Sequence, residues 1–409
     1  MKKLKMAVIG LGGRGKGIAQ KILMRMPEVE VVALCDEYAD RVQAVADFAQ
    51  ETYGKRPFTT TDHMQLLAHE GIDAVYVATS WETHVEVAID ALKKGIPVAL
   101  EVGGAYSIER LWDLVRAYEA TKTPLMFMEN CCFGKQELFV TAMVRAGLFG
   151  EIVHCHGAYA HYLADEIAGG IENRHYRLRN YLSRNCENYP THELGPIAKV
   201  LNINRGNQMI SLVSMASKAV GMEDYISQNA EKYPHLVGKK FRQGDMVNTM
   251  IYCADGSTIS LRLDTTLPRA YSREFNVHGT RGMYEMNTNT MYLAGEEESF
   301  DTVKYYRENF SNADRFADQY MPDIWKNMTD EQKKIGHGGM DGIEFGVFVN
   351  CLLENKPMPI DVYDAASWMC VTALSEASIA AGGMPQAIPD FTGGMWTRRQ
   401  PLDVIDLKI

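Results

Sequence analysis

Two side chains that could transfer protons stand three positions apart in the stretch Asn188-Tyr189-Pro190-Thr191-His192. Histidine is the side chain most easily tuned to accept and return a proton near neutral pH. If a helix begins in this stretch, Tyr189 adds a second polar group on nearly the same face as His192. The spacing therefore predicts an acid–base pair at the start of a helix.

A glycine-rich loop far upstream of this pair predicts a dinucleotide site. The pattern G-x-G-x-x-G is formed by Gly10, Gly12 and Gly15, directly after a short apolar run and directly before a helical pattern. Glycine is needed because the backbone must turn tightly and approach a pyrophosphate, whose charge the helix N-terminus stabilises. Asp36 ends the next apolar run, where a carboxylate can bind both ribose hydroxyls of NAD and repel the extra phosphate of NADP. We therefore expect NAD as the cofactor, with redox chemistry on a carbon that bears a hydroxyl.

Polar residues also follow other predicted strands, at the edge where an open α/β sheet binds ligands. Trp81 and His84 follow one strand and could pack on the nicotinamide half of the cofactor. The alternative is that Trp81 packs in the core and His84 simply starts a helix. Glu101 ends another strand, and a carboxylate there must be solvated or partnered. Asn130 ends the next strand in the same way.

The composition indicates a globular enzyme of two domains. A chain of 409 residues is too long for one compact core, and 46% hydrophobic with 23% charged residues is ordinary for a soluble protein. The net charge of −10 argues against nucleic acid or an anionic membrane as a partner. No segment approaches the length of a transmembrane helix, and the first apolar run is too short for a signal peptide.

The cysteines point to the same cellular setting. Eight are scattered along the chain without C-x-x-C spacing, which favours neither a zinc site nor a disulfide framework. This pattern fits a reducing compartment, and we expect a cytoplasmic protein. No metal site is expected either. Although His156 and His161 lie on a predicted strand, the sequence shows no paired acids or cysteines beside them.

Hydrophobic periodicity predicts an α/β protein with an N-terminal Rossmann domain and a C-terminal α/β domain that carries a mostly antiparallel open sheet. Residues 1–150 alternate between apolar runs and helical patterns, which indicates a parallel sheet with helices on both faces. In residues 151–409, strand-like runs follow one another without long helices between them. The predicted strands there are 151–162, 208–220, 246–263 and 273–286, with a hairpin turn at Asp255-Gly256. Helices are expected over 340–354 and 363–381, whereas 287–335 shows no clear period.

This layout resembles the Gfo/Idh/MocA oxidoreductases, in which a Rossmann domain precedes an α/β domain with an open sheet. Members typically carry Glu-Lys-Pro at the strand end occupied here by Glu101-Val102-Gly103. Their catalytic histidine usually lies four residues after an aspartate, at the position of Asn188 here. Because the lysine and the aspartate are both absent, alcohol oxidation by the lysine-assisted route is not the expected reaction.

The same departures resemble a narrower group, glycoside hydrolase family 109, whose members are NAD-dependent α-N-acetylgalactosaminidases. The resemblance runs from about residue 5 to residue 396. Besides Glu101-Val102 and Tyr189-Pro190-Thr191-His192, it is carried by these segments: 129–132 (ENCC), 157–161 (GAYAH), 336–341 (GHGGMD), 361–364 (DVYD) and 388–392 (IPDFT). Two details depart from the family: 186–188 (CEN) stands where members have glycine and leucine, and Phe133 replaces a usual tyrosine.

The resemblance implies a set of site residues. The residues that would contact NAD are Gly10, Gly12, Arg14, Gly15, Asp36, Trp81, Thr83, His84, Glu101, Val102, Asn130, Tyr189 and His192. The residues that would line the sugar pocket are Tyr159, Arg177, Tyr189 and Tyr271. His192, Tyr271 and Tyr159 would be catalytic. Without the resemblance, Tyr159 and Tyr271 read as packing residues of strand-like runs.

The implied reaction differs from that of ordinary glycosidases, which use two carboxylates, and NAD-dependent glycosidases are a known exception. A hydride leaves the sugar C3 for bound NAD while a base takes the hydroxyl proton, and the ketone acidifies the C2 hydrogen. Removal of that hydrogen expels the anomeric substituent, water adds, and the hydride returns. Such a route needs bases with pKa values near neutrality and hydrogen-bond donors for an enolate.

Three functions remain open from the sequence. The first is an NAD-dependent glycosidase acting on terminal α-N-acetylgalactosamine or a related sugar, and the second is an NAD-dependent sugar or polyol dehydrogenase. The third is a catalytically silent sugar- or nucleotide-binding regulator of the same fold. In each case the partner would be a small-molecule or glycan sugar, and the fold suggests a homo-oligomer formed through the open sheet.

Overall fold

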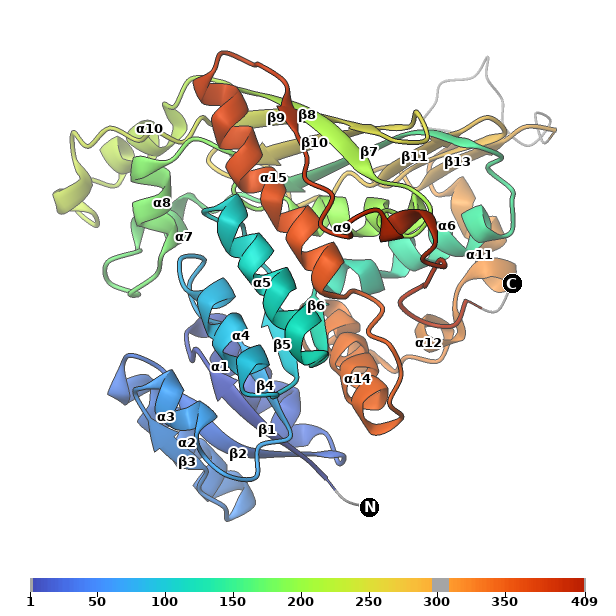
Figure 1. Cartoon of the computed structure of the whole chain (residues 1–409). Coiled ribbons are helices and arrows are strands. Elements are labelled where there is room, and N and C mark those ends of the chain that lie inside the picture. Colours follow the sequence, from blue (N-terminus) through green and yellow to red (C-terminus); the bar gives the residue numbers. More distant parts are fainter. Residues whose placement is uncertain (1–2, 296–308, 408–409) are drawn as a thin grey trace. The chain divides into compact units, whose positions relative to one another are not determined.

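The computed structural model describes residues 3–295 and 309–407, and the chain divides into two compact units. Unit 1 contains Met1–Phe133 and Asn327–Ala366, and unit 2 contains Gly134–Lys326 and Ser367–Ile409. In Figure 1, unit 1 holds the blue and cyan elements together with the orange helix α14. The chain thus passes between the two compact units three times. The predicted domains 1–150 and 151–409 meet instead at a single boundary, which stays a prediction.

Unit 1 is built on a six-stranded parallel sheet with the strand order β3-β2-β1-β4-β5-β6. The strands are β1 (Leu4–Ile9), β2 (Val29–Cys35), β3 (Phe58–Thr60), β4 (Ala74–Val77), β5 (Val98–Glu101) and β6 (Leu125–Met128). The helices between them are α1 (Gly13–Lys21), α2 (Ala39–Tyr53), α3 (His63–Leu67), α4 (His84–Lys93) and α5 (Ile108–Thr121). Every residue of β4, β5 and β6 is buried, as apolar strands covered by helices on both faces must be. The predicted doubly wound sheet is confirmed.

The strand order reverses between β1 and β4, where the two halves of a doubly wound sheet diverge. The carboxyl ends of β1 and β4 flank this reversal, and doubly wound folds bind their ligands beside such a point. The residues predicted for the cofactor follow these strands directly.

A late segment of the chain completes unit 1. Helix α14 (Met340–Leu353) begins after a short turn of 3₁₀ helix (His337–Gly339), and the ring of Phe345 packs edge-on against Tyr76 of β4 at 5.1 Å. The backbone N–H of Phe127 in β6 donates to the carbonyl of Ile360 at 2.9 Å. Segment 327–366 thus belongs to the core of the nucleotide-binding fold, although it lies some two hundred residues after it.

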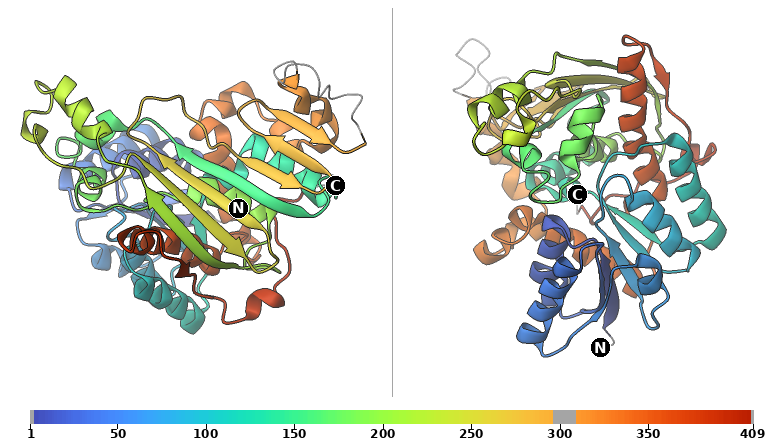
Figure 2. Two further views of the ribbon diagram at one scale, coloured as in Figure 1. Left: turned by 90° about the horizontal axis from the view of Figure 1, so that it is seen from above. Right: turned by 90° about the vertical axis from the view of Figure 1, so that its left-hand side faces the viewer.

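Unit 2 is built on an eight-stranded sheet with the order β13-β12-β11-β7-β10-β9-β8-β14 (Figure 2). Its strands are β7 (Ile152–Ala160), β8 (Met209–Ala216), β9 (Met246–Cys253), β10 (Thr258–Asp264), β11 (Asn276–Gly279), β12 (Gly282–Glu285), β13 (Thr290–Leu293) and β14 (Gln386–Ala387). All neighbours are antiparallel except β7 and β10, which run parallel. The prediction of a mostly antiparallel sheet is confirmed, and the predicted hairpin turn contains Gly256 at φ 92°.

Helices cover one face of this sheet and leave the other open. Helix α9 (Thr191–Val200) packs against β7, where a Cβ on Gly157 would come within 2.8 Å of the Glu193 Cβ. The remaining longer helices of the unit are α6 (Lys135–Arg145), α8 (Arg177–Ser183), α10 (Gly221–Gln228) and α15 (Val362–Ala380), of which α15 begins in the sequence of unit 1. On the open face, β9 alternates strictly, so that Met250 and Tyr252 are 49% and 52% exposed.

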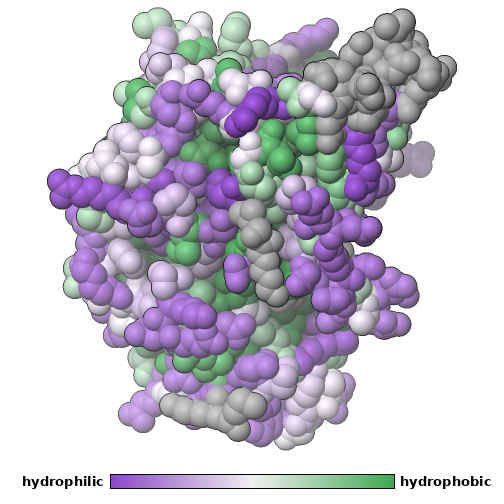
Figure 3. Space-filling model, turned by 90° about the vertical axis from the view of Figure 1, so that its right-hand side faces the viewer, coloured by the Kyte–Doolittle hydropathy of each residue, from purple (hydrophilic) through white to green (hydrophobic). Residues whose placement is uncertain are grey.

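The stretch without a clear period contains only short elements in its described part. These are β13, the 3₁₀ helix Asn312–Phe316, α11 (Ala317–Tyr320), α12 (Asp323–Lys326) and α13 (Asp330–Lys333). The predicted strand 273–286 forms two strands, β11 and β12. Among residues 3–295 and 309–407, no helix is long and apolar enough to cross a membrane. On the face that Figure 3 shows, hydrophilic and hydrophobic side chains are interspersed.

Candidate functional site

The glycine loop has the geometry that a bound pyrophosphate requires. Gly10 has φ 94°, and a Cβ there would lie 2.4 Å from the carbonyl oxygen of Ala78 at the end of β4. A Cβ on Gly15 would lie 1.8 Å from the carbonyl oxygen of Gly10. Neither position can hold a side chain without moving backbone, so the loop lies directly against the N-terminus of α1. This cradle fits a dinucleotide phosphate.

Asp36, directly after β2, holds the same loop through hydrogen bonds from the backbone. One carboxylate oxygen accepts the backbone N–H of Leu11 at 2.6 Å and the other accepts that of Tyr38 at 2.9 Å. The guanidinium of Arg41 lies 3.8 Å from the carboxylate. Because each carboxylate oxygen has two lone pairs, both retain the capacity to accept a ribose hydroxyl.

The rings beside the end of β5 account for the glycine at position 103, where the family pattern carries proline. Val102 is buried, and a Cβ on Gly103 would lie 2.5 Å from the Trp81 ring and 2.7 Å from that of His84. The two rings therefore fill the space that any side chain at position 103 would need. Burial lowers the pKa of His84 to about 4, so that its imidazole is neutral at physiological pH. Thr83 precedes α4, and its hydroxyl contacts that of Ser80 at 3.2 Å.

Arg14 lies in the first turn of α1 and is the centre of an ion-pair network in unit 1. Its Nε donates to Glu101 at 2.9 Å, and its two terminal nitrogens donate to the two carboxylate oxygens of Asp341 at 2.6 and 3.1 Å. The side-chain amide of Asn130 donates to Asp341 at 2.8 Å, and the Tyr76 hydroxyl donates to Glu101. Asp341 was not among the predicted site residues.

Unit 2 brings three predicted residues into one aromatic cluster. The ring centroids of Tyr159 and Tyr189 are 4.6 Å apart, those of Tyr189 and His192 4.8 Å, and those of Tyr159 and His192 5.5 Å. Helix α9 begins at Thr191, after Tyr189, so the turn into the helix brings the rings together rather than a shared helical face. Tyr189 and His192 are each 9% exposed.

His161 links this cluster to Tyr271. The hydroxyl of Tyr159 and Nδ1 of His161 are 3.3 Å apart, and the rings of His161 and Tyr271 pack edge-to-face at 5.0 Å. Tyr271 is 49% exposed and its hydroxyl accepts from Arg273 at 3.3 Å. It lies outside the strands, in a segment joined to β7 by one bridge at Ser272. From the sequence, His161 was weighed only as a metal ligand and was not predicted to join this cluster.

Arg177 supplies the positive charge of the cluster. Its guanidinium lies over the Tyr189 ring at 5.0 Å and pairs with Glu166 at 2.8 Å. A buried guanidinium stacked on an aromatic ring can hold a sugar hydroxyl in a fixed orientation. Burial, opposed in part by Arg177, raises the pKa of Tyr159 above its ordinary value. Tyr159 is therefore a hydrogen-bond donor near neutral pH.

His156 lies on the open face of the sheet. Its Nδ1 lies 2.8 Å from the Ser260 hydroxyl and its Nε2 lies 3.2 Å from a Glu274 oxygen. Glu274 in turn pairs with Arg262 and Arg269. This histidine thus belongs to a charged network on β7, β10 and the segment before β11.

Two family models match the chain. The model described as "Oxidoreductase family, NAD-binding Rossmann fold" matches residues 4–128, and the model described as "Glycosyl hydrolase 109, C-terminal domain" matches residues 133–398. The chain belongs to glycosyl hydrolase family 109. The predicted resemblance is confirmed, and this member of the family is an NAD-dependent glycosidase built on the Gfo/Idh/MocA fold.

Curated relatives align over nearly the whole chain. A glycosyl hydrolase family 109 protein from Stenotrophomonas maltophilia is 36% identical, covering 100% of this chain and 93% of the relative. Proteins called alpha-N-acetylgalactosaminidase from Tannerella forsythia and Shewanella oneidensis are 34% and 35% identical and cover 97% and 99% of this chain, and 88% of each relative.

Solved structures share the fold at low sequence identity. A scyllo-inositol dehydrogenase from Lactobacillus casei with bound NAD(H) and scyllo-inositol has a TM-score of 0.64 at 15% identity, over 94% of this chain and 99% of that one. An NAD-binding oxidoreductase from Klebsiella pneumoniae has a TM-score of 0.67 at 16% identity, over 95% and 99%. NAD is the cofactor of this family 109 enzyme, as its glycine loop and Asp36 predict.

The segment that departs from the family pattern is buried directly before the cluster. Gln243 holds it, because its side-chain oxygen accepts from the Asn188 amide at 3.2 Å and its amide donates to the Cys186 carbonyl at 2.9 Å. Phe133, the other departure, is fully buried in unit 1. Both departures thus alter the interior rather than the surface.

Glu187, in the same segment, is completely buried, and burial raises its pKa to about 8, against the opposing effect of the backbone N–H groups of Tyr189 and Leu263. The folded protein therefore keeps a proton that the unfolded chain loses near pH 4.5. The free energy of unfolding should therefore fall as the pH rises from about 4.5 to about 8. Glu187 should contribute a decrease of roughly 1 kcal/mol per pH unit.

Glu187→Gln should flatten that slope, which urea unfolding at pH 5 and pH 8 measures. The variant should gain stability over the parent at pH 8 and differ little at pH 5. Glu231→Gln, a change at an exposed position in the same unit, is the control and should leave the slope unchanged. An equal effect of Glu187→Gln at both pH values would show that Glu187 is ionised in the fold.

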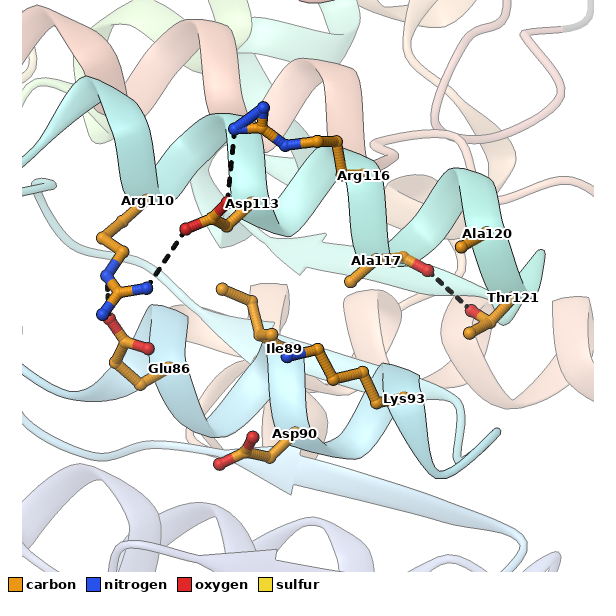
Figure 4. A pocket seen from close by; sticks show the side chains of 10 residues that line it. All are labelled: Glu86, Ile89, Asp90, Lys93, Arg110, Asp113, Arg116, Ala117, Ala120 and Thr121. Atoms are coloured by element: carbon orange, nitrogen blue, oxygen red, sulfur yellow. Dashed lines mark hydrogen bonds and ion pairs between the residues drawn. The ribbon is translucent and has the colours of Figure 1, made fainter.

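A shallow groove between α4 and α5 contains none of the predicted site residues. Arg110 lies there between Glu86 at 2.7 Å and Asp113 at 3.1 Å (Figure 4). The other lining residues mix charged and aliphatic side chains: Ile89, Asp90, Lys93, Arg116, Ala117, Ala120 and Thr121. Its charges are paired along the helix surfaces, which is typical of a solvated outer face.

Proposed function

We propose that this enzyme hydrolyses terminal α-N-acetylgalactosaminides through transient oxidation of the sugar, with no net consumption of NAD. The observation that carries the proposal is the cluster of Tyr159, Tyr189 and His192, whose rings lie within 5.5 Å of one another beside Arg177. The relatives named alpha-N-acetylgalactosaminidase support the choice of sugar.

The chemistry divides between the cofactor and the side chains of unit 2. The glycine loop and Asp36 would hold NAD, which would supply reversible hydride transfer at the sugar C3. His192 takes the proton of the C3 hydroxyl as the ketone forms and gives it back when the hydroxyl is restored. The ketone makes the C2 hydrogen acidic, so its removal and the loss of the anomeric substituent need no carboxylate pair.

The tyrosines and Arg177 serve the elimination step. Tyr159 is kept protonated by its burial and donates a hydrogen bond to the enolate oxygen. Tyr271 removes the C2 proton, because the guanidinium of Arg273 at its hydroxyl stabilises negative charge on that oxygen. Arg177 and Tyr189 orient the sugar hydroxyls. Water then adds to C1 of the enone, and C2 is reprotonated before the hydride returns.

The test is release of nitrophenol from a panel of aryl glycosides with simultaneous measurement of reduced nicotinamide. The α-N-acetylgalactosaminide should be cleaved without net accumulation of NADH. Accumulation of NADH in proportion to the sugar consumed would instead assign a sugar dehydrogenase. NAD binding without any turnover across the panel would favour a sugar-binding regulator.

The enzyme is also proposed to form a homo-oligomer through the open face of the unit 2 sheet. Met215 of β8 and Met250 and Tyr252 of β9 are about half exposed or more there, and such neighbouring apolar side chains favour burial against a second copy. The net charge of −10 supports the absence of nucleic acid and membrane partners. A cytoplasmic location is supported by eight cysteines that are all buried thiols.

Met250→Glu should dissociate this assembly, because it places a charge within the apolar patch. Sedimentation velocity should show a shift to the monomer. The control is Val237→Glu, at a position of unit 2 that is 54% exposed and lies outside the sheet, which should leave the assembly intact. An assembly that survives Met250→Glu would place the interface elsewhere.

A further inference from the structure

Asp341 connects a distant part of the chain to two residues of the predicted cofactor site. It stands in the first turn of α14, the orange helix of Figure 1, and only 1% of its side chain is exposed. Its carboxylate accepts from Arg14 beside the glycine loop and from the Asn130 amide after β6. Asp341 thus contacts two residues, Arg14 and Asn130, that precede it in the sequence by more than two hundred positions.

The pairing with Arg14 fixes the guanidinium in one orientation. The two terminal nitrogens of Arg14 reach separate oxygens of Asp341, and Nε reaches Glu101, so that all three nitrogens are engaged by carboxylates. Such two-point pairing adds direction as well as energy to an ion pair. The Arg14 side chain is still 27% exposed. Because Nη1 also lies 3.0 Å from Nδ1 of His337, the N–H capacity that Arg14 keeps for a ligand is on Nη2.

The turn before α14 is shaped to hold Asp341 in place. Four consecutive residues, 336–339, have positive φ angles. A Cβ on Gly336 would lie 2.6 Å from one carboxylate oxygen of Asp341, so only glycine fits there. Nδ1 of His337 lies 3.0 and 3.2 Å from the two oxygens. The turn closes around the carboxylate rather than merely leading into the helix.

Two buried acids in this part of unit 1 have pKa values that are shifted in opposite directions. Burial alone would raise the pKa of Asp341, but the hydrogen bond from His337 and the charge of Arg14 hold it well below its usual range. Glu344, one turn later, is completely buried, and burial together with the charges of Glu101 and Asp341 raises its pKa. Asp341 is thus ionised beside Arg14 near neutral pH, while Glu344 keeps its proton.

We propose that Asp341 is a positioning residue of the NAD site, which orients Arg14 and Asn130 toward the cofactor. Retention of NAD then depends on the turn 336–341 at the start of α14. The inference rests on NAD binding and not on the sugar reaction, so it stands or falls separately from the proposed hydrolysis.

The first test uses the holoenzyme and measures how fast bound NAD exchanges with isotopically labelled NAD in solution. Asp341→Asn keeps the shape of the side chain and an acceptor for Asn130, but it removes the charge and one acceptor that Arg14 needs. Exchange should accelerate about 10- to 100-fold, the range of a lost charge-assisted hydrogen bond. An exchange rate equal to that of the parent would overturn the proposal.

Asp403→Asn is the matched control. Asp403 pairs with Arg145 at 2.9 Å within unit 2, so this variant loses a similar ion pair that the glycine loop does not contact. It should lower the thermal unfolding temperature without changing NAD exchange. Equal acceleration in both variants would mean that exchange reports general destabilisation, and Asp341 would then have no positioning role.

A second variant tests whether Asp341 acts through Arg14. Arg14→Lys keeps the charge but cannot make the two-point pairing. We expect faster NAD exchange in this variant, and little further acceleration when Asp341→Asn is added, because both changes remove the same interaction. Additive effects would contradict the proposed route. If Asp341→Asn does not fold, Arg14→Lys alone decides the matter, since an unchanged exchange rate would refute the positioning role.

Discussion

Replacing His192 with alanine is expected to abolish turnover of an aryl α-N-acetylgalactosaminide while NAD stays bound. In the proposed scheme His192 carries the proton that must leave the C3 hydroxyl before the ketone can form. General acid–base groups contribute about 10²- to 10⁴-fold to rates, and a loss in the upper part of this range is expected here. The measurements are nitrophenol release and the NAD content of the purified variant.

The control for this variant is His235→Ala. His235 belongs to the same unit but pairs with Glu172 at the surface, at 3.8 Å, and the cluster does not include it. Its replacement should leave the rate unchanged. Because the ring of His192 packs between those of Tyr159 and Tyr189, thermal unfolding should be compared as well. Full activity in a folded His192→Ala enzyme would place the proton transfer at another residue.

Gly15→Ala is expected to abolish both NAD binding and hydrolysis. The added Cβ would lie 1.8 Å from the Gly10 carbonyl oxygen, a distance no real contact permits, so the loop and α1 must separate. Separation removes the backbone surface that the pyrophosphate would occupy. A glycosidase that works by carboxylates alone would tolerate loss of the cofactor, whereas this enzyme should lose all turnover.

Gly17→Ala in the same helix is the matched control. A Cβ on Gly17 meets nothing within 4 Å, and alanine favours a helix over glycine. The variant should bind NAD, retain hydrolysis and unfold at a slightly higher temperature. Hydrolysis by a Gly15→Ala enzyme that contains no NAD would refute the cofactor's role in the reaction.

The elements of unit 1 could be predicted closely because their signals are local. The strand Val29–Cys35 ends directly before Asp36, as predicted, and the helix Ile108–Thr121 begins after the capping residue Ser107. The parallel direction of the strands also follows from the alternation of strands and helices. The fold class and the family were therefore accessible from the sequence.

Long-range pairing was not accessible in the same way. Nothing local in residues 327–366 shows that they join the nucleotide-binding unit, because the contact between Phe345 and Tyr76 is set by packing across the chain. The parallel pairing of β7 with β10 also leaves no trace in the period of either strand. Asp341 was missed for the same reason, as its partner Arg14 lies in a distant motif.

The roles of the candidate site residues stay predictions. The sequence could indicate the surroundings of some of these residues but not of others. The glycine loop follows from spacing, since only glycine satisfies the backbone there. The contact of His161 with Tyr159 and Tyr271 depends on a single bridge between β7 and the segment before β11, which no periodicity marks.

Hydrolysis of an aryl α-N-acetylgalactosaminide in deuterated water tests the central claim most directly, with analysis of the released sugar by NMR. If the C2 hydrogen is removed and replaced during turnover, the released sugar carries deuterium at C2, while free sugar incubated with the enzyme-free buffer does not. Full hydrolysis with hydrogen retained at C2 would contradict an elimination that depends on NAD.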